Sequence, residues 1–249
     1  MINPAQALPA PSAAPQYAGA QTIGSWRSAR PLAAMTWCDV RDALARGRDR
    51  VVVPFGACEQ HGAHLPLDTL LGDGLGPLLA ERIDALCAPT LPIGCSEEHM
   101  SRAGTLSLQP ETLALIVHDL VSSLARHGFR AVVLLSTHAG NAGPLAHAAR
   151  SLKPPVGVRI VAVTDMRALA AALDRAGIGA APAEGIAHAG EIETSLLLTL
   201  APPVVCTRGP EQLEAQTAAG RVYLAAFLAE CVKQLEAQGV TPSCASAWR

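Results

Sequence analysis

The chain is 249 residues long, with 50% hydrophobic and 16% charged residues, a composition typical of a folded protein and not of a disordered one. Its net charge of -2 leaves no basic footprint of the kind that nucleic-acid binding requires. No apolar run reaches the roughly 18 residues that span a membrane, and the first residues lack the basic-then-apolar order of a signal peptide. We therefore expect a cytoplasmic protein with no nucleic-acid or membrane partner.

Residues 1–30 are rich in Ala, Pro and Gln without a period, and we expect a flexible arm ahead of a single domain at 31–249. A first helix is expected at 40–45, with Thr36 as a plausible N-cap. Beyond it, short β-branched runs alternate with helical patterns. The expected strands lie at 50–56, 89–94, 130–136 and 158–164, and the expected helices at 74–86, 111–127, 142–152, 166–176, 193–200 and 211–238.

This alternation predicts an α/β fold, with a parallel sheet and helices on both of its faces. In such sheets the ligand site lies beyond the carboxyl ends of the strands. The seven cysteines are scattered without a C-x-x-C pair, and free thiols in a reducing compartment are their simplest interpretation.

Polar and ionisable residues gather in three segments, 59–68, 136–141 and 188–195, which hold four of the eight histidines and four carboxylates. The first two segments follow expected strands. Glu59 and His61 are two positions apart, so in an extended segment both side chains leave the same face. His138 directly follows a strand and can join them. Carboxylate and imidazole ligands suit Zn, Mn or Fe.

Each of these residues also has a purely structural interpretation. An isolated E-x-H pattern is common by chance, and His64, followed by Leu-Pro, fits a turn histidine. Cys58 lies beside the first segment and is either a structural thiol or a nucleophile. Four other histidines sit in or beside helices and are expected to be surface or packing residues: His99, His118, His127 and His147.

Four ordered motifs resemble those of the creatininase (creatinine amidohydrolase) family. "PFGACEQHGAHLPLDT" resembles its E-Q-H-G-x-H-L-P-L signature, and "PIGCSEEHMSRAGTLSL" its S-x-E-H and G-T-L-S-L element. "STHAGNAG" is similar to its N-G-H-G-G-N element, and "HAGEIETSLLLTLAP" to its H-A-G-E-x-E-T-S stretch. Order and spacing agree from about residue 31 to residue 205.

The resemblance implies a three-layer α/β/α domain with a mostly parallel sheet, usually assembled into hexamers. It also implies two divalent ions, Zn by preference and Mn or Fe as alternatives, bridged by an aspartate and a hydroxide. Glu59 and His138 match ligands of one ion, and His61 matches a ligand of the other. His188 matches a histidine that handles protons near the scissile amide.

Two positions depart from the family pattern at the metal site. Gly140 stands where creatininase itself has a glutamate ligand, and our candidate for the replacement is Glu191, with Glu193 as an alternative. Leu70 stands where the bridging aspartate belongs. A two-residue gap makes Asp68 the substitute, with Asp73 as the next nearest carboxylate.

The expected function is hydrolysis of an amide C–N bond, other than a peptide bond, by a metal-bound hydroxide. His188 and Glu191 are the expected catalytic residues, and we expect His64, Ser96 and Asn141 to bind substrate. Creatininase relies on tryptophans between its third and fourth motifs, and this chain has none between His138 and His188, so creatinine is not the expected substrate.

Three alternatives remain open. Relatives of the same fold cleave a formamide in flavin or deazaflavin precursors, or clip a redox-cofactor precursor peptide of the mycofactocin type. Leu70 keeps open a catalytically impaired binding or scaffold protein. Cys58 keeps open a thiol hydrolase.

Overall fold

The computed structural model describes residues 31–61, 65, 67–163, 173, 190–201 and 217–240. Within them, four strands form one parallel sheet in the order β2-β1-β3-β4. The strands are β1 (Arg50–Phe55), β2 (Leu86–Cys87), β3 (Ala131–Ser136) and β4 (Arg159–Val163). Phe55 pairs with Ser136, so β1 and β3 end side by side at one edge of the sheet.

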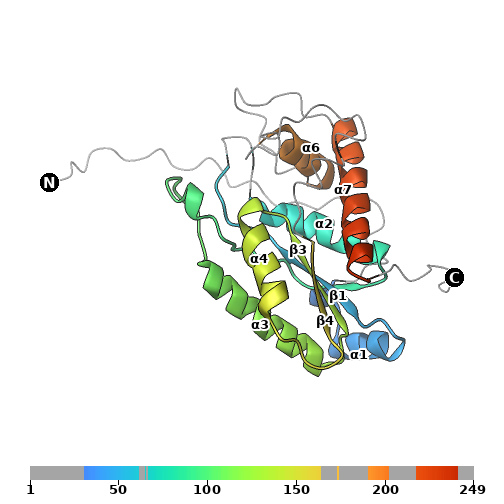
Figure 1. Ribbon diagram of the computed structural model, residues 1–249. Helices are drawn as coiled ribbons and strands as arrows, with labels where there is room; N and C mark the ends of the chain where they lie inside the picture. The colour runs from blue at the N-terminus through green and yellow to red at the C-terminus, as the bar shows by residue number, and fades with distance from the viewer. Residues whose placement is uncertain are drawn as a thin grey trace, which may run out of the picture.

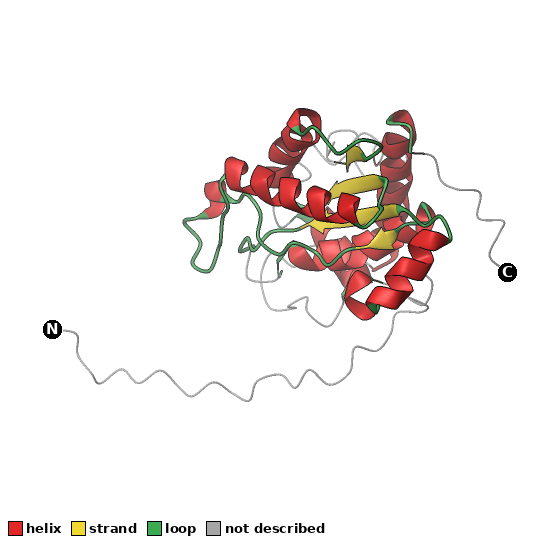
Figure 2. Cartoon of the chain, turned by 90° about the horizontal axis from the view of Figure 1, so that it is seen from below, coloured by secondary structure: helices red, strands yellow, loops and turns green. Residues whose placement is uncertain are grey.

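Helices cover both faces of this sheet (Figure 1), and the view from below shows the strands between two helical layers (Figure 2). One layer holds α1 (Trp37–Ala45), α3 (Pro110–Arg126) and α4 (Ala139–Ser151). The other holds α2 (Thr69–Arg82), α6 (Glu191–Leu200) and α7 (Thr217–Ala237). Two short 3-10 helices are η1 (Leu32–Ala34) and η2 (Glu97–His99). The expected α/β/α arrangement around a parallel sheet is confirmed.

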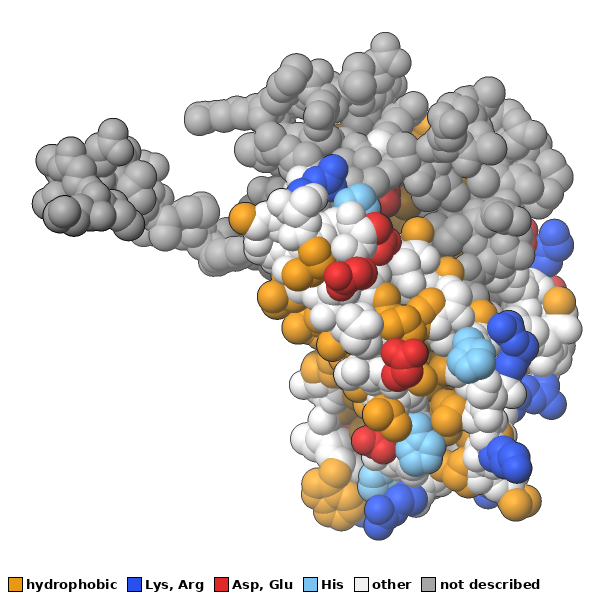
Figure 3. Space-filling model, turned by 60° about the vertical axis from the view of Figure 1, so that its left-hand side comes forward, with side chains coloured by type: hydrophobic (Ala, Val, Ile, Leu, Met, Phe, Trp, Pro, Cys, Tyr) orange, Lys and Arg blue, Asp and Glu red, His pale blue; other side chains and the backbone are white. Residues whose placement is uncertain are grey.

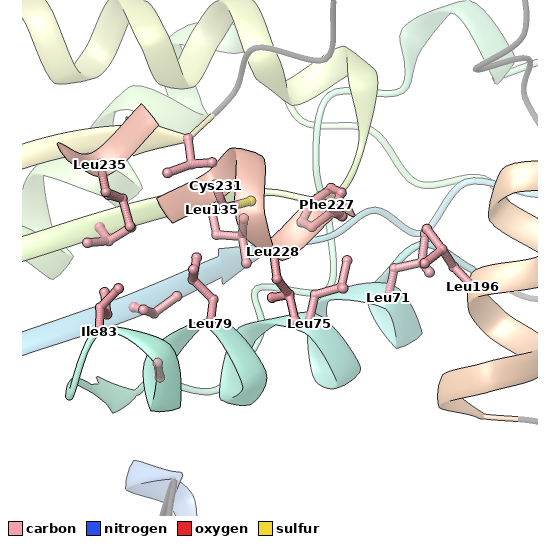
Figure 4. Close-up of a cluster of buried hydrophobic side chains, with 14 of the residues drawn as sticks. Leu71, Leu75, Leu79, Ile83, Leu135, Leu196, Phe227, Leu228, Cys231 and Leu235 are labelled. Atoms are coloured by element: carbon pink, nitrogen blue, oxygen red, sulfur yellow. The ribbon is translucent and has the colours of Figure 1, made fainter. Parts of the chain in front are cut away.

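Each face of the sheet has its own hydrophobic core, because successive strand side chains point to opposite sides. Val52 of β1 belongs to the core under α2, α6 and α7, whereas Val53 belongs to the core under α1, α3 and α4. Figure 4 shows how the first core locks α2 against α7 and its neighbours. Its labelled residues are Leu71, Leu75, Leu79, Ile83, Leu135, Leu196, Phe227, Leu228, Cys231 and Leu235.

Several expected elements form at nearly the expected places. β1, β3, β4 and α3 lie within about two residues of their predicted bounds. Thr36 caps α1 through a reciprocal capping box with Asp39. Gly128 ends α3 with a φ of 101°, a left-handed conformation that glycine adopts without steric cost.

Two predicted elements differ most from the structure. The predicted strand at 89–94 contributes only isolated bridges at Leu91 and Gly94, and the paired strand is β2, just before it. The proline at 92 removes a donor from any ladder there. Helix α2 begins at Thr69 instead of Gly74, because tertiary packing overrides the low helix propensity of its glycines. A side chain at Gly76 would meet the ring of Pro54 in β1, so this helix needs glycine to approach the strand.

The remaining boundaries are compared only where the structure describes the chain. Helix α4 starts directly after His138, earlier than predicted, and α6 starts at Glu191. The arm at 1–30 and all but one residue of the predicted helix at 166–176 lie outside the described residues. None of the described helices is long and apolar enough to cross a bilayer. On the face shown in Figure 3, charged side chains of both signs are interspersed with apolar ones.

Candidate metal centre

The side-by-side ends of β1 and β3 bring the first two polar segments together. Glu59 and His61 follow β1, and His138 follows β3 as the N-cap of α4. All three are buried, with 1%, 8% and 5% of their surface exposed. Glu59 Oε2 lies 3.1 Å from His138 Nε2, so the predicted grouping of these residues forms in the structure.

Asp68 lies between the two histidines. Its Oδ2 accepts a hydrogen bond from His138 Nδ1 at 2.8 Å, and its Oδ1 lies 3.2 Å from His61 Nε2. It occupies the N-cap position of α2 but makes no side-chain cap. Asp73, the other candidate, is exposed within α2, so Asp68 is the aspartate that the fold brings to the centre.

A second carboxylate approaches His61 from α6. Glu193 Oε2 lies 3.5 Å from His61 Nε2. On the opposite ring edge, His61 Nδ1 donates to the carbonyl of Glu59 at 2.9 Å, which directs Nε2 towards both carboxylates. Backbone contacts of this kind fix the ring orientation of metal-binding histidines.

The Glu59 side of the centre also includes η2. His99 Nε2 lies 3.2 Å from Glu59 Oε1, and Glu98 belongs to the same group of potential ligands. His138 Nε2 donates to the carbonyl of Cys95 at 2.9 Å and lies 3.3 Å from Ser96 Oγ. The loop that carries η2 therefore packs directly on the metal-ligand candidates.

Asn141 ties this loop to β1. The Cys95 backbone N–H donates to Asn141 Oδ1 at 2.8 Å, and Asn141 Nδ2 donates to the carbonyls of Gly56 at 2.9 Å and Phe55 at 3.3 Å. The residue is fully buried and both of its polar atoms have backbone partners. These contacts support a positioning role for Asn141, and the substrate contact expected of it from the sequence stays a prediction.

Burial and hydrogen bonding shift the pKa values of the carboxylates and imidazoles at the centre. Burial raises the pKa of Glu59 to about 7, although nearby His138 acts in the opposite sense. Burial alone would lower the pKa of His61, but hydrogen bonds to Asp68 and Glu193 outweigh it and raise that pKa to about 10. Burial also opposes protonation of His138, yet its hydrogen bond to Asp68 raises its pKa.

The donor set fits a pair of divalent ions. One group is Glu59, Asp68 and His138, and another is His61, Asp68 and Glu193, with the ligand atoms of each group within 4.8 Å of one another. Asp68 belongs to both groups. Carboxylate and imidazole donors are those that zinc and manganese take, and divalent ions would balance the negative charge of the buried carboxylates.

Some predicted residues cannot be compared with the structure. His64 and His188 lie outside the described residues, as does the side chain of Glu191. Ser96 is fully buried beside His138. His99, expected to be a surface or packing residue, lies at the centre, and Glu193 contacts His61 where Glu191 was the first choice. The S-x-E-H element was the available signal for His99.

The comparisons with known proteins agree with this geometry. The family model described as creatinine amidohydrolase matches residues 33–248. The chain is 33% identical over 201 residues to the mycofactocin precursor peptide peptidase of Mycobacterium ulcerans (strain Agy99). That alignment covers 76% of this chain and 70% of the relative. The chain is 34% identical over 187 residues to the creatinine amidohydrolase of Pseudomonas putida, covering 69% and 72%.

Solved creatininase structures share the fold. A mutant creatininase of the Zn-Zn type superimposes with a TM-score of 0.68 at 25% identity, over 83% of this chain and 97% of that one. A manganese form superimposes with a TM-score of 0.65 at 25% identity, over 84% and 97%. Divalent metal binding is thus a property of its structural neighbours, and the buried histidines and carboxylates described here match it in kind. From the family model, the relatives and the fold together, this chain belongs to the creatininase family of hydrolases.

Proposed function

We propose that this protein is a hydrolase that uses two divalent ions to cleave an amide C–N bond. The observation that carries the proposal is the position of Asp68, whose two carboxylate oxygens face His61 and His138 in two overlapping ligand groups. A single carboxylate shared by two groups is the arrangement that a two-metal site needs. Leu70 at the expected bridging position opened the possibility of an impaired homologue. In this proposal Asp68, two residues earlier, supplies the bridging carboxylate instead.

Divalent ions at this centre would supply an activated water and a Lewis acid that polarises the amide carbonyl. The residues of the chain prepare the centre for that chemistry. His61 is oriented by the Glu59 carbonyl, and His138 by Asp68 and the Cys95 carbonyl. Burial of Glu59, Asp68 and His138 excludes bulk water from the ligand atoms. His188 remains our candidate for passing a proton to the departing nitrogen.

The substrate we propose is an amide other than creatinine. Gly140 contributes no side chain to the centre. Trp37 is the one tryptophan among the described residues, and its side chain at the start of α1 is 74% exposed. The centre as described is therefore built from histidines and carboxylates without an aromatic wall. A formamide or another small amide fits this chemistry.

A second candidate is peptide hydrolysis. It is favoured by the 33% sequence identity to a mycofactocin precursor peptide peptidase. The identity to a creatinine amidohydrolase is nearly the same, at 34%. The same two-metal chemistry cleaves a peptide bond. Incubating the holoenzyme with N-formyl amines, with creatinine and with a library of short peptides separates the two candidates by which substrates turn over.

The metal centre is tested by replacing Asp68 with Asn and measuring metal by elemental analysis. The wild-type protein should hold close to two ions per chain, and Asp68→Asn should lose metal and activity together, because the amide cannot bridge two cations. Asp73→Asn is the matched control, since Asp73 is an exposed aspartate of the same helix, and it should keep both. Two ions retained by Asp68→Asn would overturn the proposal.

Chelation separates this chemistry from catalysis by a thiol. Cys58 is half-buried, and its Sγ lies 3.6 Å from the carbonyl of Gly104. We expect chelators to abolish activity and thiol alkylation to leave it intact. The reverse pattern would favour a cysteine nucleophile.

A further inference from the structure

Gly140 leaves a space at the metal centre that another residue fills. A Cβ built at Gly140 would meet the carbonyl oxygen of Cys95 and lie 2.6 Å from His138 Nε2. It would also lie 3.1 Å from Oε1 of Glu98. The carboxylate of Glu98 therefore stands next to the place that a side chain at position 140 would occupy, on the side of His138.

The loop that carries Glu98 is held in this space by specific contacts. Asn141, the residue after Gly140, accepts the Cys95 N–H at 2.8 Å, and Ser96 N–H donates to Ser107 Oγ at 2.9 Å. The 3-10 helix η2 follows at once, with His99 N–H bonded to the Ser96 carbonyl at 3.1 Å. The absence of a side chain at position 140 is what allows the loop to come this close.

Glu98 also belongs to a ligand group of its own. Single oxygen or nitrogen atoms of Glu59, Glu98 and His99 lie within 4.8 Å of one another. Glu59 is shared with the group that contains Asp68 and His138, so the two groups adjoin. His99 Nε2 lies 3.2 Å from Oε1 of Glu59, whereas Oε2 of Glu59 lies 3.1 Å from His138, which separates the directions of the two oxygens.

We propose that Glu98 is an additional ligand, from η2, of the ion held by Glu59 and His138. His99 acts as a positioning residue that fixes the Glu59 carboxylate through its Oε1. The inference rests on the proposed metal centre and makes that centre more specific, because it assigns a ligand from a third loop. It adds a ligand on the Glu59 side and leaves Glu193 as the carboxylate beside His61.

The chain offers a matched control one position away. Glu97 and Glu98 are both exposed on this 3-10 helix, but Glu97 belongs to no ligand group among the described residues. Glu97→Gln and Glu98→Gln therefore remove the same charge from the same short helix. Only the second should change the metal centre.

The experiment is metal titration of the full chain, stripped by chelator and dialysed against Zn²⁺ or Mn²⁺. We expect Glu98→Gln to weaken one of the two ions by at least about tenfold, the lower bound for loss of even an indirect metal contact, while Glu97→Gln matches wild type. With Co²⁺ as the probe, Glu98→Gln should also alter the visible absorption bands of one site, which loss of a purely structural contact would not do.

The outcomes separate this inference from the function on which it rests. Two ions bound by Glu98→Gln with wild-type affinity and an unchanged Co²⁺ spectrum would overturn the role of Glu98 and leave the metal centre standing. Retention of metal by Asp68→Asn would remove the centre itself. If Glu98→Gln does not fold, Glu98→Ala removes the carboxylate from this exposed position, and full wild-type affinity and spectrum in that variant would equally contradict ligation by Glu98.

Discussion

Asp68 illustrates how a single residue departs from its usual role. At the N-cap of a helix, an aspartate ordinarily accepts a backbone N–H, an interaction worth about 1 kcal/mol. Here the side chain leaves the helix start uncapped and turns to His61 and His138. A residue that breaks a local structural rule without a local gain marks a functional position.

Asn141 leads to a prediction about stability. Replacing it with Ala leaves buried backbone groups at Cys95 and Gly56 without their partner, at a cost of about 1–3 kcal/mol for a buried group left unsatisfied. Denaturant unfolding of the metal-loaded protein should show this loss. Ser123→Ala, which removes an exposed hydroxyl bonded within α3, should change the free energy of unfolding by less than about 0.5 kcal/mol. An equally small change for Asn141→Ala would contradict the positioning role.

The sequence predicts part of the centre at this scale. Glu59, His61 and His138 could be identified because each follows a strand, and parallel strands end at a common edge. Glu193 could not be chosen over Glu191 from the sequence. The two positions point about 200° apart around a helix, and only the packing of the helix decides which one faces the centre. His99 and Glu98 were missed because their closeness to Glu59 depends on how the loop docks on Gly140.

At the scale of elements, α2 couples the sheet to the metal centre. Its apolar stripe packs on α7, while its first residues follow Asp68. Thr69 at the start of α2 donates its hydroxyl to the carbonyl of Ala57 at 3.1 Å, which joins the helix to the loop after β1. The helix start was predicted too late in the sequence, because Gly72 lowers helix propensity and its close contact with Thr90 is known only from the structure.

Two glycines give opposite predictions. A Cβ at Gly56 would lie 2.6 Å from the backbone Cα of Thr69, so Gly56→Ala should destabilise the fold by about 1–3 kcal/mol, as overpacking does. It should also lower metal content, because Thr69 adjoins Asp68. A Cβ at Gly143 in α4 meets nothing within 4 Å, so Gly143→Ala should stabilise by about 0.5–1 kcal/mol. Thermal unfolding of both variants checks the pair, and equal shifts would refute the packing argument.

At the scale of the whole molecule, bound metal should stabilise the fold. A ligand that binds only the native state at 100 times its Kd adds about 2.7 kcal/mol. For a chain of this length, that corresponds to a rise in Tm of about 5–11 °C. Scanning calorimetry before and after chelation, with metal restored as the control, measures it. Stripped protein that keeps its original Tm would show that the centre does not bind metal in the native state alone.

The parallel architecture has a further consequence for the order of folding. Asp68 and His138 are 70 positions apart, and Asn141 bonds to a carbonyl 86 positions away. Contacts of such long sequence separation form late, after the entropy of closing large loops has been overcome. The ligand groups that contain His138 or Glu193 combine residues from both halves of the chain. Metal capture during refolding would therefore report when β1, β3 and α6 come together. A stopped-flow indicator of free Zn²⁺ would then serve as a clock for the last step of folding.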